Sequence, residues 1–216
     1  MVAPLNGSIT LPGDKSISHR AAMFSVLAEG TSQFDNVSDG GDVRSSINVL
    51  KKLGHDIELN GTELVAKSKS FLSLHGKNLE LDCGNSGTSL RLFTGLLCGQ
   101  NVENVSLIGD ESLSRRPHDR VIDPLKSLGV DISGRDGKFT PVTISQSKPK
   151  SGVIKMTLAS AQVKSALLLA GLYADGPVSV IEKESTRDHT ERMLIRMGAD
   201  LEINSESKTI TIHPLS

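Results

Sequence analysis

The sequence is poor in aromatic residues and carries almost no net charge. Aromatic residues make up 3% of its 216 residues, and tryptophan is absent. This scarcity argues against a protein that stacks nucleic-acid bases or sugar rings on aromatic side chains. The formal net charge of -1 gives no bulk attraction to nucleic acid or to an anionic membrane. An anion site in this chain must therefore come from a local grouping of basic side chains.

Long apolar runs, targeting signals and cysteines are also scarce. No apolar run reaches the length that crosses a bilayer, and the N-terminus lacks the charged and apolar pattern of a secretory signal. The only two cysteines, Cys83 and Cys98, lie in apolar segments without a CxxC motif or a Cys/His cluster. We therefore expect reduced, structural cysteines, a cytoplasmic protein and no metal site, with a nucleophilic cysteine as the alternative.

One stretch, LPGDKSISHR at residues 11–20, combines a chain break with basic and hydroxyl side chains. The alternation of Ser8–Leu11 predicts a short strand, and the helix-favouring residues after Gly13 place Lys15 and Ser16 on a first helical turn. The start of a helix has unpaired N–H groups and a positive dipole end, which together with Lys15 and Arg20 suit an anion such as phosphate. The alternative is ordinary serine capping beside two solvated cations.

The strand, loop and helix of this stretch recur twice, and each copy continues into a second helix with a shared ending. The three endings read VLKKLGHDIEL, PLKSLGVDISG and MLIRMGADLEI, about 70 residues apart. Their glycines, Gly54, Gly129 and Gly198, fall where a helix C-terminus favours a left-handed residue. This period predicts an α/β domain of three βαβαββ repeats with pseudo-threefold symmetry.

The first helix of each repeat is expected to be buried. These helices are apolar nearly all round, most clearly in ALLLAGL at 166–172, so they should bundle inside with the sheets outside. Each one starts in a loop of small polar residues with a serine at the helix start (Ser16, Ser86 and Ser160). If the three helices are parallel, their N-termini converge into one anion pocket. The alternative is that the repeats share only a scaffold.

Five motifs, in this order, resemble those of the enolpyruvyl transferases, and among them the 5-enolpyruvylshikimate-3-phosphate synthases: LPGDKSISHR, LDCGNSGTSLRL, GDESLSRRPHDRV, ASAQVKSALLLAGL and ESTRDHTERML. The resemblance implies transfer of the enolpyruvyl group of phosphoenolpyruvate to the 5-hydroxyl of shikimate 3-phosphate, with loss of phosphate and without metal or cofactor. Two alternatives stay open: a UDP-N-acetylglucosamine enolpyruvyl transferase, disfavoured by the absence of cysteine after Cys98, and a non-catalytic anion-binding module.

The resemblance also implies roles for single residues. Lys15 is the expected catalytic residue and contacts both substrates. Shikimate 3-phosphate is expected to bind Lys15, Ser16, Arg20, Ser160, Ala161, Gln162, Ser185 and Arg187. Phosphoenolpyruvate is expected to bind Lys15, Asn85, Gly87, Thr88, Arg116 and Gln162.

Some of these residues carry a further interpretation or an alternative. Glycine rather than alanine at Gly87 suggests sensitivity to the inhibitor glyphosate. For Arg116, a surface salt bridge is the alternative. Arg91 is interpreted as loop support, and Lys164 is assigned no role. Three histidines beside the motifs are expected to be solvated or capping: His19, His118 and His189.

Enzymes with these motifs are about twice as long and have two similar domains. The resemblance therefore implies that residues 12–216 form the first domain and that residues 1–11 belong with an absent second, C-terminal domain. The acid–base carboxylates and further basic residues come from that domain. Since proton transfer needs a positioned acid or base, we expect this chain alone to bind shikimate 3-phosphate weakly and not to turn over.

Overall fold

The last third of the chain shows the repeating unit in its complete form. In the computed structural model, which describes residues 6–215, it contains β10 (Gly152–Lys155), α6 (Ala161–Gly171), β11 (Val178–Ile181), α7 (His189–Arg196), β12 (Leu201–Asn204) and β13 (Thr209–Ile212). The sheet order is β10-β11-β13-β12, with β10 and β11 parallel and the other pairs antiparallel. This is the predicted βαβαββ unit.

The middle unit repeats this topology with additions. Its elements are β5 (Glu80–Asp82), α3 (Gly87–Leu97), β7 (Val105–Ile108), α5 (Asp119–Ser127), β8 (Ile132–Arg135) and β9 (Phe139–Ile144), and the sheet order is β5-β7-β9-β8. A short parallel pair, β4 (His75–Lys77) and β6 (Asn101–Glu103), and the single-turn helix α4 (Glu111–Ser114) are added to it. The order of strands is thus the same in both units.

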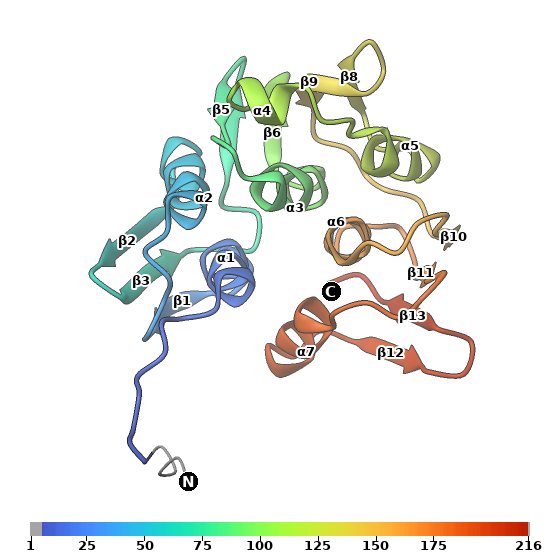
Figure 1. Ribbon diagram of the computed structural model, residues 1–216. Coiled ribbons are helices and arrows are strands. Elements are labelled where there is room, and N and C mark those ends of the chain that lie inside the picture. Colours follow the sequence, from blue (N-terminus) through green and yellow to red (C-terminus); the bar gives the residue numbers. More distant parts are fainter. Residues whose placement is uncertain (1–5, 216) are drawn as a thin grey trace, which may run out of the picture.

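Within residues 6–215, the first unit lacks the first strand of the repeat. It consists of α1 (Lys15–Phe24), β1 (Gly30–Phe34), α2 (Gly41–Lys52), β2 (Asp56–Asn60) and β3 (Glu63–Ser68), in the sheet order β1-β3-β2. The strand predicted at Ser8–Leu11 is wrong: these residues lead away from the sheet, and Ile9 is 83% exposed (Figure 1). Alternation alone does not make a strand, because a strand needs a neighbouring edge to pair with.

The glycines of the repeated endings take the conformation expected of them. Gly54, Gly129 and Gly198 have φ values of 85°, 80° and 90°, each one residue after the cap of a second helix. Residues with a side chain rarely adopt this left-handed region, which explains glycine at these three positions. The strands β2, β8 and β12 begin shortly afterwards, as predicted.

The first helices of the units form the interior. Figure 1 shows α1, α3 and α6 gathered at the centre, nearly end-on, with α2, α5 and α7 farther out and the sheets outermost. All residues from Ala166 to Ala170 are fully buried, which confirms the prediction of buried inner helices. Helices α3 and α6 pack directly against each other. The pseudo-threefold arrangement therefore follows from three buried helices that share one core.

Three further expectations concern the whole chain. Burial raises the pKa of both thiols, Cys83 and Cys98, and neither forms a disulfide, which favours the structural role over a nucleophilic one. Among residues 6–215, none of the helices has the length and apolar character needed to cross a bilayer. The predicted boundary between 1–11 and 12–216 stays a prediction, since residues 1–5 lie outside the described part of the chain.

Candidate functional site

Side-chain oxygens cap the N-termini of the three inner helices. Ser86 Oγ and Ser160 Oγ accept from the amides three residues further on, at 3.0 and 3.4 Å. Helix α1 is capped instead by Asp14, whose Oδ1 accepts from such an amide at 2.8 Å. Ser16 is the second residue of α1, so a serine lies at the start of each inner helix as predicted, although in α1 it is not the cap. Each of these caps satisfies the third amide of its helix, so the amides of the first two residues remain available to a ligand.

The starts of α3 and α6 are joined by hydrogen bonds. Gln162 Nε2 donates to Thr88 Oγ1 at 2.9 Å, and Arg91 Nη1 donates to Gln162 Oε1 at 2.6 Å. Arg91 is 4% exposed, and burial, followed by the charges of Arg120 and Arg116, lowers its pKa to about 10. Arg91 thus stays charged at neutral pH and holds the amide of Gln162 in place, which agrees with its interpretation as a supporting residue.

Gly87 lies against this supporting arginine. A Cβ atom at Gly87 would come within 2.8 Å of Arg91 Nη1, closer than van der Waals contact allows. An alanine there would have to push the guanidinium of Arg91 away from Gln162. Glycine at this position therefore leaves room for the contact between Arg91 and Gln162, which joins the starts of α3 and α6.

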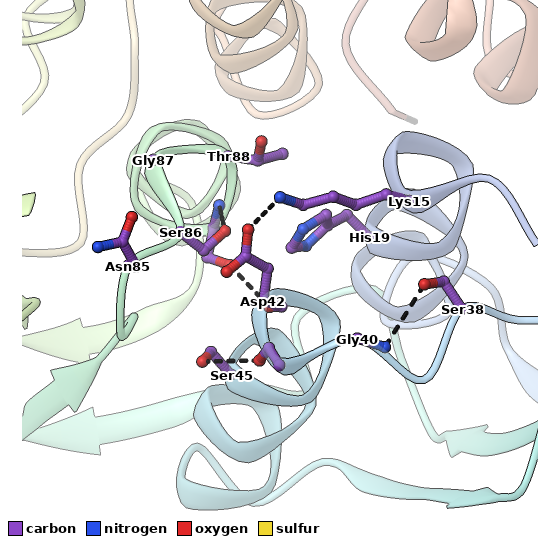
Figure 2. A network of polar contacts seen from close by, with 12 residues as sticks. Lys15, His19, Ser38, Gly40, Asp42, Ser45, Asn85, Ser86, Gly87 and Thr88 are labelled. Carbon is purple, nitrogen blue, oxygen red and sulfur yellow. Dashed lines mark hydrogen bonds and ion pairs between the residues drawn. The ribbon is translucent and has the colours of Figure 1, made fainter.

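Lys15 reaches from α1 toward the start of α3. Figure 2 shows its amine pointing toward the start of α3, near Thr88, and forming an ion pair with the carboxylate of Asp42. The side chains of Lys15 and Asp42 are 57% and 28% exposed, so this pair is open to solvent. Asp42 was missed by the sequence reasoning; an acidic residue in the first turn of a helix is common and gave no signal of a tertiary contact. An anion at this place competes with Asp42 for Lys15.

A buried chain of neutral groups lies beneath Lys15. His19 Nδ1 and Ser46 Oγ are 2.8 Å apart, and Ser46 Oγ and Ser89 Oγ are 2.7 Å apart, which joins α1, α2 and α3. Burial, followed by the charge of Lys15, lowers the pKa of His19 to about 4. The ring is therefore neutral at pH 7. The expectation of a solvated or capping histidine is wrong here, because this face of α1 is turned inward.

His118 also lies inside. It is fully buried, its two ring nitrogens have no hydrogen-bond partner within the described chain, and burial followed by the charge of Arg91 lowers its pKa to about 4. It occupies the cap position of α5, but its side chain forms no capping bond. The predicted solvated or capping role is thus wrong for His118 as well. His189, the first residue of α7, is half-buried.

Asn85 and Arg116 are exposed and bonded to each other. Arg116 Nη2 donates to Asn85 Oδ1 at 2.9 Å and to Ser112 Oγ at 3.0 Å. Asn85 Nδ2 donates to Asp110 Oδ2 at 2.6 Å. The amide of Leu113 and then the side chain of Asn85 lower the pKa of Asp110. Arg116 makes no ion pair with a described carboxylate, so the alternative of a surface salt bridge finds no support in the structure.

Arg20 is buried and joins α1 to α6 and α7. Its Nε donates to Thr190 Oγ1 and its Nη2 to Ser165 Oγ, both at 2.7 Å, and its Nη1 donates to the Ser16 carbonyl at 3.0 Å. Burial, the largest cause, lowers the pKa of Arg20 to about 10, which leaves it charged at neutral pH. Arg20 is 4% exposed, so little of its guanidinium is accessible to solvent.

Ser160 and Ala161 begin α6 and are half-buried, whereas Ser185 and Arg187 lie exposed on the loop after β11. The side chains of Ser185 and Arg187 form no hydrogen bond within the described residues. Sequence reasoning assigned no role to Lys164, which is buried among carboxylates. The signal in the sequence that could have pointed to this cluster is a single lysine in a mostly apolar helix.

The structure brings several of the expected residues together near the starts of the inner helices. Contacts join Lys15 to the start of α2, Thr88 to Gln162, and Arg116 to Asn85. A hollow of about 280 Å³ adjoins Lys15 and Asp42. A larger one of about 700 Å³, between α5 and β10, includes none of the expected residues. This end of the bundle therefore offers exposed and buried cations, amide groups and open helix ends, which can hold an anion of more than one charge.

Comparisons with known proteins agree with this description. The sequence model of a family described as EPSP synthase (3-phosphoshikimate 1-carboxyvinyltransferase) matches residues 1–216. Curated relatives named 3-phosphoshikimate 1-carboxyvinyltransferase include one from Bacillus pumilus, 46% identical over 96% of this chain and 49% of its own length. Another, from Thermoanaerobacter sp., is 47% identical over 97% of this chain and 49% of its own length.

A solved structure of an EPSP synthase from Acinetobacter baumannii superimposes with a TM-score of 0.91. It is 38% identical in sequence, and the match covers 97% of this chain and 48% of that one. The chain thus spans about half the length of the curated relatives and solved structures it matches.

Proposed function

Because this chain belongs to the EPSP synthase family, we propose that it is the substrate-holding half of a 3-phosphoshikimate 1-carboxyvinyltransferase. Such an enzyme moves the enolpyruvyl group of phosphoenolpyruvate to the 5-hydroxyl of shikimate 3-phosphate and releases phosphate, in the cytoplasm. The observation that carries the proposal is the meeting of three inner helix starts, linked through Thr88 and Gln162 and faced by Lys15. Both substrates are anions with more than one charge, which suits this combination.

We assign the two substrates to two sides of the site. The α6 side, with Ser16, Arg20, Ser160, Ala161, Ser185 and Arg187, holds shikimate 3-phosphate. The α3 side, with Asn85, Gly87, Thr88 and Arg116, holds phosphoenolpyruvate and the inhibitor glyphosate. Lys15 and Gln162 lie between the two sides, since Lys15 reaches toward α3 and Gln162 bonds Thr88 from α6. Each of the two therefore contacts both substrates.

The contribution of this half is alignment and charge stabilisation. Helix starts and fixed cations bring two anions together and stabilise charge that develops during the reaction. Lys15 is the residue we propose as catalytic, because its ammonium is exposed and reaches the boundary between the two substrates. Full turnover also needs acid–base groups, which we place in a second domain that completes the enzyme.

Calorimetric titration with shikimate 3-phosphate tests this proposal. We expect saturable heat at millimolar ligand, and at least tenfold weaker binding in Lys15→Ala and Arg20→Ala. The matched control is Lys77→Ala, since Lys77 is also exposed and also forms an ion pair, with Glu103 at 2.8 Å. Its affinity should stay within twofold of the parent chain. Absence of heat at millimolar ligand, or equal losses in Lys15→Ala and Lys77→Ala, would contradict the proposal.

Phosphate release separates the enzyme from a binding module. The chain alone should release no phosphate from the two substrates, and addition of the other half of a related enzyme should restore release. A chain that binds shikimate 3-phosphate but stays inactive with a second half would support the non-catalytic anion-binding module. The UDP-N-acetylglucosamine alternative is no longer needed, since the family match is to the EPSP synthases.

A further inference from the structure

Three charged side chains are buried together behind the α6 side of the site. Lys164 Nζ lies 2.6 Å from Glu191 Oε1 and 3.1 Å from Glu182 Oε1. The three side chains are 1%, 2% and 6% exposed, in that order, so none can contact a ligand directly. Removing charges from water is costly unless they are paired and hydrogen-bonded. We therefore expect this cluster to have a role in addition to packing in the core.

Glu182 connects this cluster to the loop that carries two of the proposed substrate contacts. Its Oε1 accepts hydrogen bonds from Thr186 N at 3.1 Å and from Thr186 Oγ1 at 2.5 Å. Thr186 is the residue between Ser185 and Arg187, whose own side chains make no hydrogen bond within the described chain. The backbone of this loop is thus fixed at Thr186, and Thr186 is fixed by a carboxylate that Lys164 holds in place.

The other carboxylate of the cluster holds the same loop from its far end. Glu191 lies in α7, next to Thr190, and Thr190 Oγ1 is bonded to Arg20 and to Ser165. The loop between β11 and α7 is therefore tied at both ends to α6. A single buried lysine thereby links the start of α6, the loop and α7.

We propose that Lys164, Glu182 and Thr186 are positioning residues for shikimate 3-phosphate, which hold the Ser185–Arg187 loop against the start of α6. This inference rests on the proposed function, because it is that function that assigns Ser185 and Arg187 to the phosphate of the substrate. The cluster touches no substrate; it fixes the backbone from which two ligand contacts project. Charged acceptors form stronger hydrogen bonds than neutral ones, which explains a carboxylate at Glu182.

The test removes one of the two hydrogen bonds that link Glu182 to the loop, the one from the Thr186 hydroxyl, and leaves the backbone bond and the ion cluster intact. Thr186→Val keeps the size of the side chain and deletes only the hydroxyl donor, whereas Thr186→Ser keeps the donor. Thr211→Val is the matched control, because Thr211 is likewise half-buried and its Oγ1 lies 2.8 Å from Ser179 Oγ, in the sheet. Dissociation constants for shikimate 3-phosphate come from NMR titration. Hydrogen exchange of the amides 183–188 and of α6 is followed in the same proteins.

We expect Thr186→Val to bind shikimate 3-phosphate five- to tenfold more weakly, with faster exchange at 183–188 and unchanged exchange in α6. Thr186→Ser and Thr211→Val should stay within twofold of the parent chain. An unchanged affinity of Thr186→Val, or a loss accompanied by faster exchange throughout α6, would overturn the positioning role while leaving the proposed function in place. A parent chain that does not bind at millimolar ligand would instead contradict the proposed function itself.

Discussion

Two sets of buried side chains join the inner helices to their neighbours, and they differ in chemistry. We call the set on the α3 side the neutral joint and the set on the α6 side the charged joint. On the α3 side, α1 meets α2 and α3 through neutral buried groups, His19, Ser46 and Ser89. On the α6 side, α1 meets α6 and α7 through the charged Arg20, and the cluster around Lys164 lies behind it. The α6 side contains the buried cations Arg20 and Lys164, whereas the buried groups that join α1 to α2 and α3 are neutral; Arg91, also buried, joins α3 to α6. A substitution on the α3 side should therefore be able to change ligand affinity without changing stability, whereas a substitution on the α6 side should change both.

The largest effect is expected from a substitution that breaks the charged joint. Lys164→Met leaves Glu182 and Glu191 buried without their cation, which should lower the free energy of unfolding by about 3–5 kcal/mol. Lys155→Met, at an exposed position of β10, is the control and should change stability by less than about 0.5 kcal/mol. Urea unfolding measures both. A loss below about 1 kcal/mol in Lys164→Met would show that the cluster does not hold the joint.

Acid should weaken the neutral joint. The pKa of His19 is lowered from 6.5 to about 4, so between these pH values the unfolded chain binds a proton that the folded chain does not. Stability is therefore lost as the pH falls from about 6.5 toward 4, by up to roughly 3 kcal/mol for this ring. Urea unfolding at several pH values should show a shallower acid loss in His19→Gln than in the parent chain. Parallel curves for the two proteins would contradict the burial of a neutral His19.

Arg116 tests whether binding separates from folding on the α3 side. Arg116→Ala should weaken phosphoenolpyruvate binding about tenfold, a loss of about 1.4 kcal/mol, with no measurable change in unfolding. The neighbouring Arg115→Ala is the matched control, since Arg115 is equally exposed but is paired with Glu111 on the helix surface. Calorimetric titration in the presence of shikimate 3-phosphate measures both. Equal losses of affinity in the two variants would mean that the effect comes from the positive charge of this region and not from Arg116 itself.

Gly87→Ala should have the smallest effect. Its methyl group meets Arg91 Nη1, so the contact between Arg91 and Gln162 should loosen, with a three- to fivefold loss of affinity for phosphoenolpyruvate and for glyphosate. Gly41→Ala is the control, because Gly41 begins α2 and a Cβ there meets nothing within 4 Å. Titration with glyphosate checks the prediction. Unchanged affinity in Gly87→Ala would mean that Arg91 moves aside freely.

The repeats could be predicted from the sequence because their signals are local. The glycines Gly54, Gly129 and Gly198 mark helix ends, and the run 166–172 marks a buried helix, without knowledge of distant contacts. Tertiary pairing could not be predicted in the same way. Asp42 in α2 meets Lys15 in α1, and Lys164 in α6 meets one carboxylate in α7 and one in the loop after β11, so no spacing in the sequence reports these contacts.

The failed predictions have the same origin. The strand expected at Ser8–Leu11 required an edge to pair with, which alternation cannot supply. The solvated histidines His19 and His118 turned out buried, because the repeat turns those helix faces inward. The roles implied by the motifs placed Lys15, Thr88 and Gln162 at one end of the inner helices, where the structure also has them. Motif resemblance thus selected residues that lie close together, whose binding of substrate stays a prediction, and only the structure located the groups that support them.

The central claim is that three inner helix starts form one site for one set of anions. An NMR titration of the amide-labelled chain with shikimate 3-phosphate tests it most directly. We predict that the amides of Ser16 and Gln162, which belong to the shikimate 3-phosphate site, and the amide of Thr88, whose hydroxyl is bonded to Gln162, shift together with a single dissociation constant. Shifts confined to one helix start, or different dissociation constants at the three, would contradict the claim.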